Sequence, residues 1–229
     1  VGSEMCIRDS LMYLPKHFAR QDLLELQDFI VQYPFGTLAT AIDGQVEMNH
    51  LPFYLDREQQ CLQAHIPRAN PLYQTLKNVF ESENPSPIEV LVAFHGPNAY
   101  ITPSWYPSKK EHGKVVPTWN YTVVHARGTL QMRSEESWLS QHLSNLTNQQ
   151  EPKRNSTWQM QDAPQEYTAS MMRVLCGLEI TIKELTGKYK VSQNREDRDQ
   201  VAVLSNLSQS EDAQERALAQ FHQQANKPL

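Results

Sequence analysis

The first clear pattern along the chain predicts a helix near residue 22. Asp22 can cap this helix, and the helix is expected to end at Tyr33, because Pro34 disfavours helical geometry in the residue before it. Apolar residues recur at spacings of three and four, which predicts one buried face. That face comprises Leu23, Leu26, Phe29 and Ile30.

Shorter alternations of apolar and polar residues follow, and they predict strands. Phe35–Ala41 and Gln45–Leu55 flank the pair Asp43-Gly44, which is typical of a hairpin turn. Pro52 lies inside the second strand and indicates a sheet edge or a bulge, because proline has no N–H to donate to a neighbouring strand.

Two further strands and one helix are predicted before residue 95. Cys61–Ile66 reads as a strand. Asn70 and Pro71 favour the start of a helix that runs to about Phe80, with asparagine as the cap and proline at the first helical position. Ile88–Phe94 is an almost continuous apolar run, which favours a central strand.

The stretch Gly96–His125 concentrates aromatic residues, prolines and polar strand residues. Two extended segments, Tyr100–Trp105 and Val115–Arg127, are predicted on either side of a basic loop. Flat aromatic side chains beside hydrogen-bonding groups suit a planar ligand with polar edges. An edge hairpin with a solvated face is the alternative. The polar groups at strand positions are Thr102, Ser104, Thr118, Asn120, Thr122 and His125.

The last third of the chain alternates between helices and strands. Ser134 can cap a helix, and the polar stretch Thr147–Gln161 reads as a long loop. Another helix is expected to run to about Val174, before the half-buried strand Gly177–Leu185. The buried stripe of the helix that follows Ser134 comprises Trp138, Leu139, His142, Leu143 and Leu146.

Composition is that of an ordinary globular protein, with 39% hydrophobic and 21% charged residues among 229. The net charge of −5 and the isoelectric point near 5.9 oppose a surface built for nucleic acid, so DNA contact would need a local basic patch. No apolar run approaches the roughly 18 to 20 residues that span a bilayer. Cys6, Cys61 and Cys176 have no paired spacing, which predicts reduced thiols in a cytoplasm.

The predicted organisation is one main domain with a segment on either side. Val1–Leu11 fits no pattern that follows and resembles a translated artefact, so it is set aside from the fold. Residues 12–208 are expected to form the folded domain. Residues 209–229 are rich in Gln and Ala and are expected to form a loosely docked polar helix or tail.

A candidate anion site lies where the third strand meets its helix. His65 and Arg68 come immediately before the helix that Asn70 caps. A helix N-terminus offers N–H groups and partial positive charge, and arginine can hold a phosphate through two hydrogen bonds. Such junctions also occur without a ligand. Asn49 and His50, just before the interruption of the second strand, could leave backbone groups for a ligand or could form a capped bulge.

A second candidate follows the turn expected at Thr186-Gly187. The segment Lys188–Asn194 places two lysines around a tyrosine, followed by three uncharged hydrogen-bonding residues. It could present cations to an anionic ligand, or it could be the solvated end of a hairpin.

Sequence motifs of common catalysts are missing from the chain. It has no glycine-rich nucleotide loop, no nucleophile elbow, no HExxH pair and no CxxC pair. Cys61 and His65 have a metal-like spacing, but on a strand their separation suits a shared zinc ion poorly. No basic recognition helix follows a helix–turn–helix pattern. The chain therefore indicates a binding site more clearly than a catalyst, and no metal is expected.

Several long motifs, in order, resemble the PaiB family. They include MYLPKHF from Met12, NHLPF from Asn49, HIPRANP from His65, FHGPNAYITPSWYPSKKEHGKVVPTWNYTVVHARG from Phe94 and GKYKVSQN from Gly187. The resemblance extends to about residue 207. It implies a bacterial FMN-binding negative transcriptional regulator, of the kind that represses sporulation and protease genes in relatives.

The resemblance also implies a fold and an assembly. The expected fold is mainly β with peripheral helices (α+β), the FMN-binding split β-barrel of pyridoxamine 5′-phosphate oxidases. A homodimer with flavin at the subunit interface is expected, with six or so antiparallel strands in each copy. The strand count from the pattern is compatible with that barrel.

The resemblance assigns roles to residues of the two candidate sites. His65, Arg68 and Asn70 are expected to hold the FMN phosphate. Asn49, His50 and Leu51 are expected to lend backbone groups to the flavin ring, at positions where oxidases of this fold carry arginine and lysine. The residues expected to line the rest of the pocket, from opposite subunits, are Trp105, Trp119, Asn120, Lys188, Ser192 and Gln193.

Two hypotheses for the function follow. The first is a regulator whose bound flavin adjusts its association with DNA or with a protein partner. The second is a flavin-dependent oxidoreductase without direct DNA binding, in which hydride chemistry belongs to FMN. His125 and His50 are the first residues to test as proton donors. The family resemblance favours the regulator.

Overall fold

The structure is a computed structural model that describes residues 12–225. The leader expected at Val1–Leu11, which includes Cys6, lies outside the described residues. Cys61 and Cys176 are both buried free thiols. Within residues 12–225, no helix combines the length and apolar character needed to cross a bilayer.

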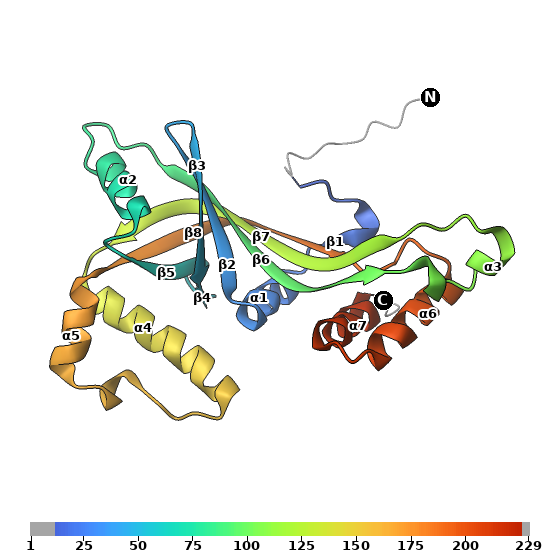
Figure 1. The fold of residues 1–229 in the computed structure, drawn as a ribbon. Helices are drawn as coiled ribbons and strands as arrows, with labels where there is room; N and C mark the ends of the chain where they lie inside the picture. The colour runs from blue at the N-terminus through green and yellow to red at the C-terminus, as the bar shows by residue number, and fades with distance from the viewer. Residues whose placement is uncertain (1–11, 226–229) are drawn as a thin grey trace. The chain divides into compact units, whose positions relative to one another are not determined.

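An antiparallel sheet of eight strands organises the described residues (Figure 1). Hydrogen-bonded neighbours follow the order β3-β2-β6-β7-β8-β5-β4, and β1 pairs with β8. This order does not return to its first strand, so the sheet is open. The strands are β1 Ala19–Arg20, β2 Phe35–Ile42, β3 Gln45–Pro52, β4 Tyr54–Asp56, β5 Cys61–Pro67, β6 Ile88–Ile101, β7 Thr118–Arg133 and β8 Leu175–Lys190.

Helices occupy most of the connections between these strands. The α-helices are α1 Leu23–Gln32, α2 Pro71–Phe80, α3 Lys109–His112, α4 Glu136–Gln150, α5 Gln165–Arg173, α6 Asp197–Gln209 and α7 Ala213–Ala225. The 3-10 helices are η1 Lys16–Phe18, η2 Pro103–Trp105, η3 Glu151–Arg154 and η4 Met160–Asp162.

The chain forms two compact units, which we call unit 1 and unit 2. The described part of unit 1 comprises residues 12–21, 96–123 and 186–225, and unit 2 comprises residues 22–95 and 124–185. The long strands β6, β7 and β8 each contribute to both units.

Unit 2 has a core of aliphatic and aromatic side chains. The rings of Phe53 and Phe94 are fully buried and meet edge to face, with centroids 5.5 Å apart. The hairpin between β2 and β3 turns at Asp43 and Gly44, whose φ angles of 51° and 75° lie in the left-handed region. This confirms the predicted turn, since hairpin turns of this kind need positive φ at both central residues.

Two helix starts in unit 2 follow their predicted caps. Asp22 Oδ1 accepts from the N–H of Glu25 at 2.9 Å and begins α1, and Asn70 begins α2 with Pro71 at its first position. The predicted apolar face of α1 was wrong at Leu23, which is 49% exposed. The other three positions of that face are buried.

Unit 1 contains a helical pair, α6 and α7, which lie beside each other (Figure 1). The helix expected to be a loosely docked tail buries Leu218 and Phe221. The Phe221 ring meets the buried Tyr189 ring edge to face, with centroids 5.1 Å apart. The end of the described chain is therefore packed through an apolar face.

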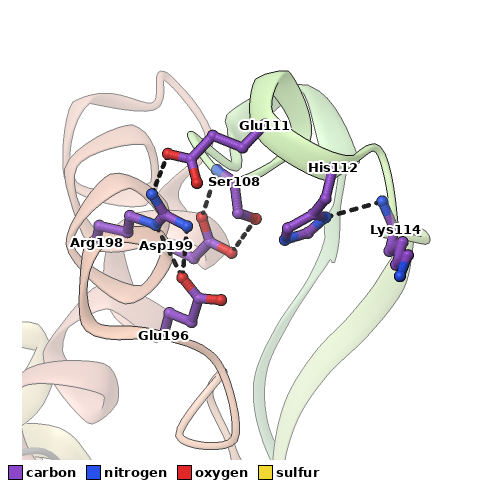
Figure 2. Close-up of polar contacts among 7 residues, drawn as sticks. All are labelled: Ser108, Glu111, His112, Lys114, Glu196, Arg198 and Asp199. Carbon is purple, nitrogen blue, oxygen red and sulfur yellow. Dashed lines mark hydrogen bonds and ion pairs between the residues drawn. The ribbon is translucent and has the colours of Figure 1, made fainter.

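Polar contacts join α3 to the start of α6 within unit 1 (Figure 2). Ser108 donates from Oγ to Asp199 Oδ2 at 2.6 Å and from its backbone N–H to Oδ1 at 3.1 Å. Arg198 pairs with both Glu111 and Glu196. Asp199 is buried, and its two hydrogen bonds compensate for lost hydration.

Three other local predictions were wrong. The strand predicted over Tyr100–Trp105 ends at Ile101 and gives way to η2, because Thr102 Oγ1 accepts from the Ser104 N–H at 3.2 Å and Pro103 fits the first helical position. The basic loop contains the short helix α3. The long loop predicted after α4 is shortened, since α4 continues to Gln150 and η3 follows.

Two further local predictions, of a cap and of a turn, were also wrong. Ser134 does not cap α4, whose N-cap is Glu135. Thr186 and Gly187 lie inside β8, and Gly187 pairs with Arg20 of β1. The partner strand supplies the hydrogen bonds that keep this segment extended.

Candidate functional site

Asn70 joins α2 to strand β3 in unit 2. Its Oδ1 accepts from the N–H of Leu72 at 2.9 Å, which is the helix cap, and its Nδ2 donates to Asn49 Oδ1 at 2.8 Å. The structure therefore brings together two of the predicted site residues, which are 21 positions apart in the chain. Both the oxygen and the nitrogen of the Asn70 side-chain amide are hydrogen-bonded, so the orientation of the amide is fixed.

The three predicted residues of β3 are divided between the two faces of the strand. Asn49 is half-buried and Leu51 is buried, on the side where the hairpin meets Asn70. His50 points to the opposite face because side chains alternate along a strand. It is exposed, and its Nδ1 lies 3.1 Å from Thr37 Oγ1.

The first N–H groups of α2 are already occupied. Pro71 has none, the Leu72 N–H binds the cap, and the Tyr73 N–H donates to Asn70 O at 2.9 Å. The helix dipole still favours an anion at this end. Direct binding of a phosphate would depend on side chains, and the sequence alone did not reveal this.

Arg68 is the cation at this junction. Its Nε donates to Leu175 O at 3.1 Å and its Nη1 donates to Tyr73 Oη at 2.9 Å, while the guanidinium lies 5.4 Å from the centre of the Tyr73 ring. The residue is exposed. A guanidinium held in place on one edge and open to solvent is suited to bind a phosphate.

His65 contacts a residue that the sequence did not indicate as its partner. Its Nδ1 lies 3.0 Å from Nε2 of His142 on α4. The His142 ring stacks on Trp138, with centroids 5.2 Å apart and an interplanar angle of 23°. His142 was predicted to lie on the buried stripe of this helix, and it is fully buried.

A buried carboxylate continues this network. Glu179 Oε2 accepts from Trp138 Nε1 at 3.1 Å, and Glu179 Oε1 pairs with Arg133 Nη2 at 2.5 Å. A cavity of about 320 Å³ adjoins these side chains. The spacing of Trp138 and His142, four residues apart on a helix, was the only sequence signal of this cluster.

Burial controls the ionisation of the histidine pair. It lowers the pKa of His65, and together with the smaller effect of the nearby His65 it lowers the pKa of His142 to about 3. Both imidazoles are therefore neutral near pH 7, and neither supplies positive charge to a ligand.

The predicted site residues of unit 1 form a cluster of their own around the end of β8. Asn120 is fully buried and donates from Nδ2 to Ser192 Oγ at 2.8 Å. Ser192 has a φ of 69°, in the left-handed region. Gln193 uses its side-chain amide locally, since Oε1 accepts from Val191 N at 2.7 Å and Nε2 donates to Tyr189 O at 2.5 Å. Gln193 therefore fixes the backbone at the end of the strand.

Two lysines lie among aromatic side chains in the same cluster. Lys188 donates to Tyr13 O at 2.8 Å, and its Nζ is 5.4 Å from the ring centres of both Tyr13 and Tyr121. Lys190 donates to Trp119 O at 2.5 Å, and burial lowers its pKa, with Lys188 as a further cause. The lysine that the sequence singled out, Lys188, is thus buried and held by aromatic faces.

The two tryptophans of the predicted site differ in exposure. Trp119 is 52% exposed and donates from Nε1 to Asn98 Oδ1 at 2.9 Å, while its ring meets Tyr100 edge to face. Trp105 ends η2 and is half-buried. An exposed aromatic pair on the neighbouring strands β6 and β7 offers a flat surface for a planar ligand.

A further hollow lies elsewhere in unit 2. It measures about 840 Å³ and is lined by the β2–β3 turn and the segment that follows α2. Its charged residues are Asp43, Glu47 and Glu89, and no Lys, Arg or His lines it. An acidic lining opposes a phosphorylated ligand, so we place no cofactor there.

The fold defines the class of protein. The flavocytochrome Anf3 from Azotobacter vinelandii aligns with a TM-score of 0.55 and 15% identity, over 81% of this chain and 75% of that one. The FAD and heme binding protein from Mycobacterium smegmatis aligns with a TM-score of 0.56 and 15% identity, over 80% and 78%. The chain has the split-barrel fold of these flavoproteins, which confirms the expected fold class.

The sequence defines the family. The profile described as "Putative FMN-binding domain" matches residues 12–184, and the chain belongs to that family. A protein of Emericella nidulans is 35% identical over 224 residues, which cover 85% of this chain and 89% of the relative. The "Protease synthase and sporulation protein PAI 2" of Bacillus subtilis is 29% identical over 212 residues, 92% of this chain and 96% of the relative. The resemblance to the PaiB family is confirmed, and the relatives include fungal as well as bacterial proteins.

Proposed function

We propose that this protein binds FMN through the junction of β5 and α2 in unit 2. The observation that carries the proposal is the exposed guanidinium of Arg68, held by Leu175 O and the Tyr73 side chain at the N-terminal end of α2. Membership of the FMN-binding domain family supports a flavin as the ligand. The phosphate is the only dianionic part of FMN, and it needs a cation of this kind.

The neighbouring residues complement Arg68 in this proposal. His65 adds a neutral hydrogen-bonding group, and the Asn70–Asn49 pair ties the junction to strand β3. The backbone of Asn49, His50 and Leu51 then offers hydrogen bonds to the edge of the flavin ring. The dipole of α2 favours the phosphate without any free N–H at its first positions.

Purified protein titrated with FMN is expected to quench flavin fluorescence with a saturable curve. Arg68→Ala removes a charge-assisted contact, so we expect the binding free energy to weaken by about 1.5–3 kcal/mol, which is roughly ten- to a hundredfold in Kd. Arg57→Ala is the matched control, because Arg57 is an exposed arginine of the same unit that pairs with Asp28. Equal affinities for the wild type and Arg68→Ala would remove Arg68 from the site.

We further propose that the protein acts as a homodimer. One face of the β2–β3 hairpin in unit 2 exposes large apolar side chains, namely Phe35, Val46 and Met48. A second copy covering this face would remove them from water, and His50 lies on the same face as Val46 and Met48. A flavin bound along β3 would then lie at the interface between the two copies.

As to biological role, we propose negative transcriptional regulation, in which FMN changes the association of the dimer with DNA or with a protein partner. The name of the Bacillus subtilis relative, a protease synthase and sporulation protein, supports this role. The net charge of −5 favours a second candidate, a flavin-dependent oxidoreductase that does not contact DNA. In that case the hydride chemistry would belong to the bound flavin, and the chain would orient it.

One pair of assays distinguishes the two roles. A regulator is expected to shift promoter fragments at low salt, with an affinity that changes on adding FMN and falls steeply as salt rises. An oxidoreductase is expected to oxidise NAD(P)H when FMN is added and to leave the fragments unshifted. Oxidation without any FMN-dependent association, either with DNA or with a co-purified partner, would contradict the regulatory role.

A further inference from the structure

The helix α4 packs on β8 at a glycine. His65 of β5 pairs in register with Gly177 of β8. A Cβ atom added at Gly177 would lie 2.3 Å from Cζ3 of Trp138, so the indole lies in the space that a side chain would fill. The hydrogen bond from Trp138 Nε1 to Glu179 Oε2 then fixes the rotation of that ring. His142 is stacked on it one turn further along α4.

His142 has one nitrogen with a partner and one without. Its Nε2 faces Nδ1 of His65 at 3.0 Å. Its Nδ1 is inaccessible to solvent and has no hydrogen-bond partner among residues 12–225. A neutral imidazole carries one proton, so the position of that proton on His142 decides which ring donates in the pair.

Two arrangements of the protons are possible. In the first, His65 Nδ1–H donates to an unprotonated Nε2 of His142. The proton of His142 then lies on its buried Nδ1, and this N–H has no acceptor. In the second, His142 Nε2–H donates to a bare Nδ1 of His65, and only an unprotonated nitrogen is left without a partner. Buried N–H groups without acceptors are rarer in proteins than acceptors without donors. The second arrangement also gives both rings the Nε2–H form, which neutral imidazole side chains prefer in water.

We propose that His142 is a positioning residue that holds His65 in its Nε2–H form, so that His65 presents a neutral N–H donor to the cofactor phosphate. The hydrogen bond from His65 to the phosphate rests on the proposed function, whereas the protonation of His65 does not. Arg68 then supplies the charge at the junction and His65 supplies a hydrogen bond.

This division of roles explains why a histidine whose pKa is lowered by burial can serve an anion site. A neutral ring in the opposite form would turn a bare nitrogen toward the phosphate, and two acceptors would repel each other. The charged groups next to the pair, Glu179 and Arg133, compensate each other through their ion pair. The donor is therefore set by geometry rather than by charge.

The first test is made on the full chain without flavin. Uniform ¹⁵N labelling of histidine and long-range proton–nitrogen correlation spectra distinguish a protonated ring nitrogen from a bare one, and His65→Asn identifies the signals of His65. We expect His65 to show a bare Nδ1 and a protonated Nε2. A protonated Nδ1 on His65 would overturn the proposal, whether or not FMN binds.

Two substitutions at position 142 test the positioning role. Phenylalanine keeps a ring against Trp138 but has no donor, so His142→Phe is expected to release His65 into a mixture of forms and to weaken FMN binding on the order of tenfold. Glutamine can place an amide N–H where His142 Nε2 lies. In His142→Gln, both the protonation form of His65 and the affinity for FMN are therefore expected to stay near those of the wild type. His95→Phe, at an exposed histidine of the same unit, is the control.

The outcomes separate the two proposals. If His142→Phe changes the form of His65 but leaves FMN affinity unchanged, the role of His65 in phosphate binding is overturned. If the wild type does not bind FMN, the proposed function fails, and the spectrum of the flavin-free protein still decides whether His142 sets the proton of His65. If His142→Phe does not fold, the wild-type spectrum alone decides that point.

Discussion

Gly128→Ala is expected to lower the free energy of unfolding by about 3 kcal/mol, the upper part of the range for overpacked interiors. A Cβ atom at Gly128 would lie 2.2 Å from the backbone oxygen of Thr181 and 2.8 Å from Cγ2 of Ile180. The first clash is with backbone of the neighbouring strand, which cannot turn away as a flexible side chain can. β7 and β8 would have to separate at this point, and the buried face of β7 that carries Ala126 and Leu130 would be disturbed with them. Urea unfolding followed by circular dichroism measures the change.

Gly44→Asn is the matched control for this substitution. Gly44 has a φ of 75° and nothing within 4 Å of an added Cβ atom, and asparagine tolerates the left-handed region better than other side chains. We expect its stability to stay within about 0.5 kcal/mol of the wild type. Equal losses for both variants would mean that the contact with Thr181 is not the cause.

Local signals predicted the parts of the fold that depend on a few neighbouring residues. Asp22, Asn70 and the Asp43-Gly44 turn each act within one turn of the backbone, so their positions could be read from the sequence. Gly187 shows where this reading fails. The local sequence predicts a turn there, but Gly187 pairs with Arg20, which is 167 positions earlier in the chain. The local pattern of apolar and polar residues does not indicate a strand partner at that distance in the sequence.

The candidate site was predictable to a similar extent. The sequence identified His65, Arg68 and Asn70 as neighbours of a helix start, and the structure joins Asn70 to Asn49. It did not indicate that the Asn70 cap and its own carbonyl occupy the first N–H groups of α2. It also did not indicate that His142 binds His65, because that contact spans 77 positions and depends on how α4 packs over Gly177.

Met48→Glu is expected to separate the proposed dimer into monomers. Met48 is 66% exposed on unit 2, and its register partner on β2 is Ala39, while the exposed Val46 faces Ala41. Small residues on one strand and large ones on the next make an apolar surface that a second copy can cover. A carboxylate buried there without a partner costs about 3 kcal/mol, on the order of a hundredfold in the dimer Kd. Sedimentation velocity over a range of concentrations measures the shift.

Val201→Glu is the control, because Val201 is also 66% exposed but lies on α6 in unit 1. It is expected to leave the dimer intact, and a wild type that is monomeric at all concentrations would contradict the assembly itself. The flavin titration then adds a second result. His50 lies on the same face as Met48, so a flavin shared by two copies should bind the Met48→Glu monomer more weakly than the Val201→Glu dimer. Unchanged affinity in a folded monomer would place the whole flavin site within one chain, with Arg68 as its cation and no contribution from the interface between the two copies.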